Sequence, residues 1–201
     1  GDWSSDVCSS DLRIRPYVKF GLATGGYRTD NTSVDLRHET VNFGLGLILN
    51  TSSQIRASLN FFEFQKENNW EVFQRDNLFG YFDKKMISSG LDIDWFPGNN
   101  QEFRLKAFVY AIKANNSRAF EVNPSGYMSS SNINVNDFQL SEIAFQIRYK
   151  YEFSPLSNLY VVYTRGGKSS GELQDSFDGL YANAWNEQTL DKLIVKIRYK
   201  F

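Results

Sequence analysis

The sequence predicts an all-β fold: an antiparallel up-and-down sheet of about eight strands that forms part of a transmembrane β-barrel. Apolar and polar residues alternate over segments of roughly 9–12 residues, the length that a tilted strand needs to cross a bilayer. Long and short connections also alternate along the chain, as they do in membrane barrels. The last twelve residues, 190–201, have one apolar face and end in Phe201.

Residues 1–12, GDWSSDVCSSDL, stand apart from the rest of the chain. They are rich in Ser and Asp, lack strand alternation, and resemble the translation of a common sequencing-library adapter. We therefore expect them to be a non-native tail, with a flexible natural tail as the alternative. The chain's single cysteine, Cys8, lies in this tail, so residues 13–201 contain no disulfide framework. The natural sequence would then start near Arg13, within a longer chain. We therefore expect residues 13–201 to be the C-terminal segment of a larger barrel.

The alternation divides residues 13–201 into strands and connections. We expect strands at 13–22, 41–49, 54–64, 87–96, 102–112, 138–153, 158–164 and 190–201. The long polar connections are expected at 25–36, 66–83, 115–136 and 166–189. Short turns are expected near Ser52, Gly98 and Leu156. Pro16 cannot donate to a strand ladder, so the first strand should lie at an edge of a curved sheet.

The charged residues of these strands fall on the face opposite the apolar residues. A basic side chain facing lipid at the bilayer midplane costs about 2–4 kcal/mol, so these charges should face the lumen. The predicted lumen-facing residues are Arg56, Arg104, Lys106, Asp92, Asp94, Arg148, Lys150, Lys196 and Arg198. They could form a network of salt bridges without selectivity, or a basic wall that prefers anionic solutes.

Aromatic residues are frequent and cluster near the short turns. They make up 16% of the chain, which is usual for barrels with aromatic girdles at the bilayer surfaces. If the C-terminus is periplasmic, the short turns lie on the periplasmic side. The predicted periplasmic girdle consists of Trp95, Phe96, Tyr151 and Phe153.

A soluble antiparallel sheet with one face packed on a core is the competing interpretation. Soluble sandwiches also alternate polar and apolar residues, but their strands usually have about 5–6 residues. Their loops also have no reason to alternate in length. The pattern of this chain therefore favours a barrel over a sandwich.

The closing strand resembles the final strand of bacterial outer-membrane β-barrels, which the barrel-assembly machinery reads as a signal. The positions that match this signal are Leu193, Val195, Ile197, Tyr199 and Phe201. Residues 147–167, IRYKYEFSPLSNLYVVYTRGG, together with the closing LIVKIRYKF, are similar to the C-terminal end of one family. It is a Bacteroidetes-type outer-membrane β-barrel family of unknown function that follows a carbohydrate-binding family 9-like module.

This resemblance implies a location, a set of partners and a missing module. It implies a barrel in the bacterial outer membrane with a periplasmic C-terminus, in contact with lipid and with the barrel-assembly machinery. Saccharide binding would belong to the N-terminal module, which residues 13–201 do not contain. No site residue for a sugar can therefore be assigned from the resemblance.

The sequence offers no catalytic, cofactor or metal site. His38 is the chain's one histidine, and no cysteine lies near it in sequence; a lone histidine is more often a surface residue than a ligand or base. The net charge of −1 gives no basic field for binding nucleic acid. Three functions remain: passage or docking of a solute linked to a glycan-binding module, an outer-membrane hydrolase, or a purely structural membrane anchor.

Overall fold

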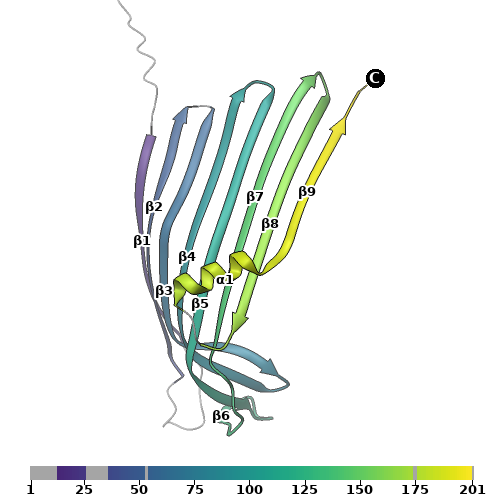
Figure 1. Ribbon diagram of the computed structural model, residues 1–201. Coiled ribbons are helices and arrows are strands. Elements are labelled where there is room, and N and C mark those ends of the chain that lie inside the picture. The colour runs from purple at the N-terminus through teal and green to yellow at the C-terminus, as the bar shows by residue number, and fades with distance from the viewer. Residues whose placement is uncertain (1–12, 26–35, 53, 174–175, 201) are drawn as a thin grey trace, which may run out of the picture.

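The computed structural model describes residues 13–25, 36–52, 54–173 and 176–200, and it consists almost entirely of one antiparallel sheet (Figure 1). The strands are β1 (Arg13–Gly25), β2 (His38–Ser52), β3 (Ile55–Arg75), β4 (Leu78–Gly98), β5 (Gln101–Val122), β6 (Met128–Ser130), β7 (Phe138–Ser154), β8 (Ser157–Gly171) and β9 (Gln188–Arg198). Eight strands follow one another in sequence order, and the short β6 pairs with β5 outside this path. The all-β, up-and-down prediction is confirmed.

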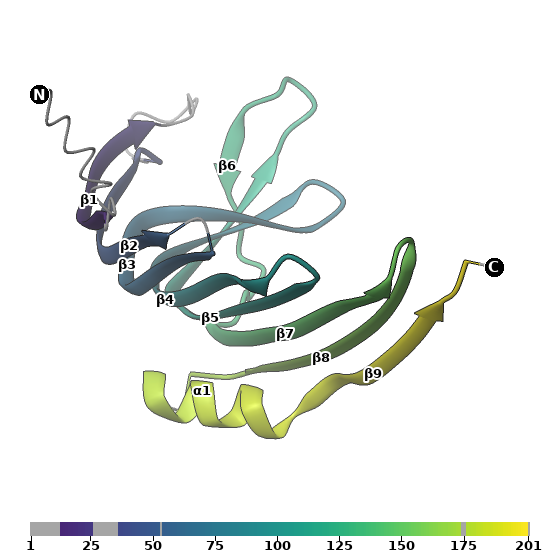
Figure 2. The same cartoon turned by 90° about the horizontal axis from the view of Figure 1, so that it is seen from above.

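The described sheet is open and curved. β1 pairs with β2 and β9 pairs with β8, and β1 does not pair with β9. Figure 2 shows the strands arranged along an arc, with β1 and β9 at its two ends. The prediction that the first strand is an edge of a curved sheet is confirmed, and Pro16 lies in that edge strand.

The register brings apolar residues of all eight strands onto a single face. Directly opposed residues on neighbouring strands share a face, so the pairing can be followed across the whole sheet. One such row contains Ile14, Leu49, Ala57, Ile93, Leu105, Ile147, Tyr163 and Leu193. The adjacent row on the opposite face contains Arg13, Asn50, Arg56, Asp94, Arg104, Arg148, Val162 and Ile194.

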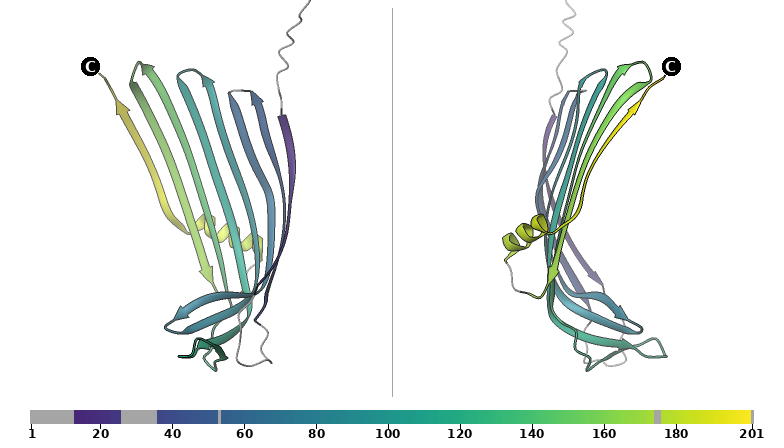
Figure 3. Two further views of the ribbon diagram at one scale, coloured as in Figure 1. Left: turned by 180° about the vertical axis from the view of Figure 1, so that it is seen from behind. Right: turned by 45° about the vertical axis from the view of Figure 1, so that its right-hand side comes forward.

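The apolar face is the convex face of the arc. The helix α1 (Phe177–Asn186) contacts this face through Ser141, which alternates with Ile143, Phe145 and Ile147, and Figures 2 and 3 place α1 on the outside of the curve. Large apolar side chains on this face are exposed, among them Val18 at 66%, Phe20 at 69% and Ile197 at 68%. The polar residues therefore occupy the concave face.

The strands β3, β4 and β5 are about twice as long as predicted, with 21, 21 and 22 residues. The predicted loop at 66–83 is wrong, because these residues form the two arms of a hairpin that turns at Asp76 and Asn77. Register shifts interrupt the alternation there, and Asn69 and Asn116 adopt left-handed φ angles of 58° and 55°. Asn tolerates this conformation, which lets a strand bend.

A cluster of buried hydrophobic residues lies at the bent ends of these strands. Leu36, Tyr81 and Phe120 are buried there, and the rings of Tyr81 and Phe120 meet edge to face with centroids 5.1 Å apart. Figures 2 and 3 show these strand ends bending over the concave side. This cluster of buried side chains thus lies at one end of the sheet instead of beneath its apolar face.

The predicted loops at 115–136 and 166–189 are also wrong in part. β5 continues to Val122 and β6 follows, while β8 continues to Gly171 and is followed by α1. Ser176 caps the helix by accepting a hydrogen bond from the Gly179 amide at 3.1 Å. Ten residues with one narrow apolar stripe are a weak sequence signal for a helix, because short helices depend on tertiary packing.

α1 packs on the convex side of β5, β7 and β8 through small residues. Leu180 and Ala184 are fully buried against the sheet, and the Ser141 hydroxyl donates to the Leu180 carbonyl at 2.7 Å. Burial, and then the nearby Asp178 carboxylate, raises the pKa of Tyr181. The protonated phenol of Tyr181 donates to the Ile87 carbonyl at 3.1 Å.

No helix within the described residues has the length and apolar composition of a membrane-crossing helix.

Replacing Gly167 by valine should displace α1 from the sheet. A Cβ at Gly167 would collide with the carbonyl oxygen of Ala184, and overpacking of this kind costs about 1–3 kcal/mol. We expect a lower midpoint of thermal unfolding and an altered Trp185 fluorescence. Gly171→Val is the matched control, because a Cβ at Gly171 meets no atom within 4 Å. An equal effect of both variants would contradict the close contact at Gly167.

Candidate functional site

The concave face carries the predicted lumen-facing charges in adjacent register rows. Arg56, Asp94, Arg104 and Arg148 are successive partners in one row, and Asp92 and Lys106 are partners in the next. Arg104 Nε lies 3.5 Å from Asp94 Oδ1 and also pairs with Glu102. Strand alternation places Lys150, Lys196 and Arg198 on this same face.

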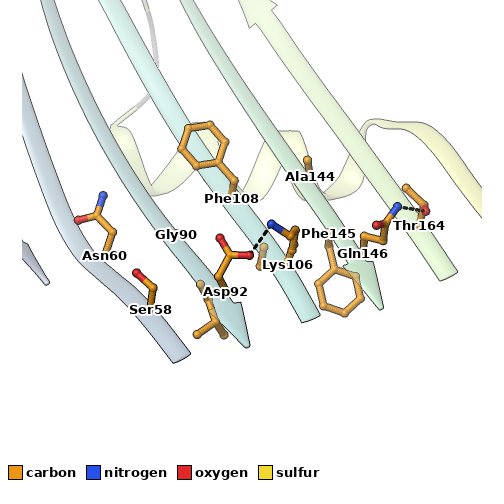
Figure 4. A pocket seen from close by; sticks show the side chains of 12 residues that line it. Ser58, Asn60, Gly90, Asp92, Lys106, Phe108, Ala144, Phe145, Gln146 and Thr164 are labelled. Atoms are coloured by element: carbon orange, nitrogen blue, oxygen red, sulfur yellow. Dashed lines mark hydrogen bonds and ion pairs between the residues drawn. The ribbon is translucent and has the colours of Figure 1, made fainter. Parts of the chain in front are cut away.

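A shallow depression lies in the middle of this face, between β3, β4, β5, β7 and β8 (Figure 4). Its volume is about 470 Å³. The Lys106 ammonium and the Asp92 carboxylate form an ion pair of 2.8 Å in its centre. On one side, the Gln146 amide donates to the Thr164 hydroxyl at 3.2 Å. The depression therefore presents charges, an amide and a hydroxyl in a small area.

The polar wall on the other side of the depression contains Ser58 and Asn60. The Asn60 amide nitrogen donates to Glu63 Oε2 at 3.2 Å. Its carbonyl oxygen is buried and has no hydrogen-bond partner among the described residues. Buried polar atoms are normally satisfied, so this oxygen is suited to accept a hydrogen bond from a solute or from water.

An exposed aromatic ring borders the same depression. Phe108 lies one position along the concave face from Lys106, and 48% of its surface is exposed. Its ring is tilted against that of Tyr110, with centroids 5.7 Å apart, and the Tyr110 hydroxyl donates to Glu142 at 2.8 Å. An aromatic surface beside a few converging polar groups is the usual composition of a small-molecule site.

A second group of concave-face residues is buried under the bent strand ends. The Lys84 ammonium lies 2.7 Å from Glu67 Oε2 and 4.8 Å from the centre of the Trp70 ring. Trp70 contacts Phe82 and Phe138, whose rings meet edge to face at 5.1 Å. This cluster holds the bent hairpin to the sheet, and its limited exposure makes it structural.

The residues of the predicted assembly signal line the outer edge of the sheet. Leu193, Val195 and Ile197 lie on the convex face of β9, and Tyr199 follows them and stacks on Phe153 at a centroid distance of 6.3 Å. Phe201 is outside the described residues.

The predicted girdle residues lie at the end of the sheet that contains the short turns and Lys200 (Figure 1). Trp95 is on the convex face and meets Phe103 edge to face at 6.2 Å. Tyr151 shares that face through its partner Leu159. Phe96 directly follows Trp95, so alternation turns it to the concave side.

Sequence reasoning missed Phe108 and Lys84 as members of the concave face. Phe108 follows Arg104 and Lys106 on the same face of β5, so alternation predicts which face it lies on. Alternation does not predict that its ring borders a depression. Lys84 lies between the predicted loop at 66–83 and the predicted strand at 87–96, and no apolar alternation survives the register shift between Tyr81 and Asp83. The local sequence signal for the bend is the residue type at Asn69 and Asn116, since Asn tolerates the positive φ found there.

Two of the ion pairs on this face, one buried and one exposed, should differ in their contribution to stability. Lys84 and Glu67 have side chains 10% and 15% exposed, and breaking such a pair costs about 3–5 kcal/mol. Lys106 and Asp92 are 63% and 57% exposed, so their coupling should be about 0.2–1 kcal/mol. Denaturant unfolding of Lys84→Met and of a Lys106→Met, Asp92→Asn double-mutant cycle measures both. Equal losses from Lys84→Met and Lys106→Met would contradict this assignment.

Comparison with known proteins relates this geometry to a sequence family. A family described as "Domain of unknown function (DUF5916)" matches residues 4–201. The match begins within residues 1–12, whose non-native origin stays a prediction because they lie outside the described residues. Neither the curated proteins nor the solved structures contain a match. The chain belongs to the DUF5916 family.

Proposed function

We propose that this chain is part of an outer-membrane β-barrel that contacts lipid through its convex face and carries or docks a polar solute along its concave face. The observation that carries the proposal is the register: it brings apolar residues of eight strands onto the convex face and the predicted lumen-facing charges onto the concave face. Alternation of this kind is characteristic of membrane barrels, whose interior is polar.

The height of the apolar face supports this proposal. On β5, convex-face residues from Phe103 to Ala111 are all apolar, and the next residue on that face is Lys113. These positions cover roughly 27 Å of strand at about 3.4 Å per residue. A strand tilt of roughly 35–45° reduces this to about 20 Å, near the apolar band of about 25 Å in outer-membrane barrels.

The soluble sandwich is less consistent with the arrangement of layers. A sandwich needs a second sheet about 10 Å from the apolar face. Within the described ranges, α1 alone covers that face, and it covers parts of β5, β7 and β8. The edge residues Val18, Phe20 and Ile197 stay more than half exposed. A lipid environment would cover them without a second protein layer.

The chemistry of the concave face favours a polar solute without a strong charge requirement. Lys19–Glu63 at 3.3 Å, Lys106–Asp92 and Arg104–Asp94 offset basic charge with carboxylates. This pairing favours the salt-bridge interpretation of the wall over strong anion preference. The exposed ring of Phe108 beside hydroxyl, amide and carboxylate groups suits a saccharide, whose ring has an apolar face and a polar rim.

The resemblance to a family that follows a carbohydrate-binding family 9-like module agrees with this class of solute. We propose that a glycan-binding module would precede the barrel and deliver or retain the saccharide. The periplasmic position of the C-terminus, the role of β9 in assembly and the aromatic girdle belong to the same proposal.

A charge introduced on the convex face should prevent membrane insertion. Ile147→Arg adds a charge to the middle of the apolar face, where lipid exposure costs about 2–4 kcal/mol. Gln146→Arg changes the neighbouring residue on the concave face and is the matched control. Flotation with phosphatidylcholine vesicles should recover the wild type and Gln146→Arg with the lipid, and much less Ile147→Arg. Recovery of the wild type in the aqueous fraction would contradict the proposal.

The depression at Phe108 should influence saccharide passage. In a liposome-swelling assay with the intact protein, Phe108→Ala should slow entry of an oligosaccharide several-fold while leaving glycerol entry unchanged. Phe73→Ala is the control, because Phe73 is 60% exposed and lies on the bent hairpin outside the depression. Equal slowing by both substitutions, or none by either, would remove Phe108 from the proposed site.

A further inference from the structure

Three lysines lie side by side on the convex face. Lys66 is the register partner of Lys85, and Lys85 is the partner of Lys113, so β3, β4 and β5 each contribute one. Lys66 and Lys85 are exposed and Lys113 is half-buried. We call Lys66, Lys85 and Lys113 the lysine row. Like charges placed directly opposite one another destabilise a sheet unless something compensates them.

The lysine row forms one boundary of the apolar face. The adjacent convex row toward the short turns contains Phe64, Ile87 and Ala111, which are register partners. Apolar residues therefore extend up to the lysines and stop there on all three strands. Where an apolar belt meets water, a basic side chain can extend its stem along the apolar surface and its ammonium into the interface.

The helix α1 lies at the same level of the convex face. Lys113 Nζ is 5.1 Å from the centre of the Phe177 ring, and Tyr181 bonds to Ile87 beside Lys85. Trp185 is 48% exposed, and the Arg165 guanidinium lies 4.3 Å from the centre of its ring. Trp is enriched at membrane–water interfaces. The helix and the lysine row are therefore two independent features at the same level of the convex face.

Carboxylates near the lysine row are engaged elsewhere. Lys66 and Lys85 form no ion pair with another described residue. Asp83, one convex position beyond Lys85, accepts from the Asn116 amide at 2.7 Å. Asp137 accepts from the Ser117 amide at 2.9 Å. Within the described ranges, no carboxylate therefore forms an ion pair with Lys66 or Lys85.

We propose that the lysine row binds the phosphate groups of a phosphorylated glycolipid headgroup at this boundary of the membrane. Three ammonium groups on adjacent strands match an anionic headgroup that bears more than one phosphate, and the apolar residues next to them contact its acyl chains. The inference rests on the proposed membrane location and adds a lipid-binding site to it.

The test is titration of the full chain, folded in a neutral detergent, with bis-phosphorylated lipid A, followed by Trp fluorescence and thermal unfolding. Dephosphorylated lipid A and inorganic phosphate are the comparison ligands. We expect tight binding of the phosphorylated lipid alone. The Lys66→Gln, Lys85→Gln, Lys113→Gln triple variant should bind about a hundredfold more weakly, since each basic residue near an anionic surface contributes about fivefold.

Two further variants separate the possible causes of weaker binding. Lys150→Gln, Lys168→Gln, Lys192→Gln removes the same charge from the concave face and should bind normally. Lys66→Arg, Lys85→Arg, Lys113→Arg keeps the charge and should retain most of the affinity. Equal binding of phosphorylated and dephosphorylated lipid, equal weakening by both Gln triples, or binding of inorganic phosphate with the same affinity would overturn the inference.

Flotation of the wild type with phosphatidylcholine vesicles distinguishes the two proposals. Flotation without any preference for phosphorylated lipid overturns the lysine-row site and leaves the membrane location standing. Failure to float contradicts the membrane location itself.

Discussion

The rest of this structure depends on the strand register, because it decides what each face meets. A shift of one residue in any strand would turn that strand's apolar side chains to the concave face. Instead, a continuous apolar row runs from Ile14 in β1 to Leu193 in β9 through six intervening strands. The apolar face needs a cover, and α1 supplies one over part of three strands among the described residues. A lipid bilayer is the cover that the proposed function assigns to the remainder.

The two faces impose different requirements on the same backbone. On β3, β4 and β5 the convex face carries no charge between the short turns and the lysine row, and basic residues reappear at Lys66, Lys85 and Lys113. The concave face tolerates charge but pairs it, as in Lys106–Asp92. These requirements explain why a chain with a net charge of −1 contains a strongly apolar surface.

The ends of β3, β4 and β5 fold over the concave side of the sheet. Strands of 21 or 22 residues extend beyond the apolar part of the convex face. The lipid proposed for that face would not cover these strand ends. Register shifts and the left-handed Asn69 and Asn116 turn these ends over the concave side. Trp70, Phe82 and Phe138 then pack together there. The cluster of Leu36, Tyr81 and Phe120 buries further apolar surface in the same region.

The sequence by itself determined the strand class, the face of residues in the regularly alternating part of each strand and the three short turns, because a period of two is a local property of the chain. Tertiary structure decided what alternation cannot encode: the extension of β3, β4 and β5, the folding of their ends and the docking of α1 on Ser141 and Gly167. It also decided that Lys66, from the predicted loop at 66–83, meets Lys85 and Lys113, which lie outside the predicted strands, in one row. Cross-strand neighbours depend on register, and register is fixed by the whole sheet at once.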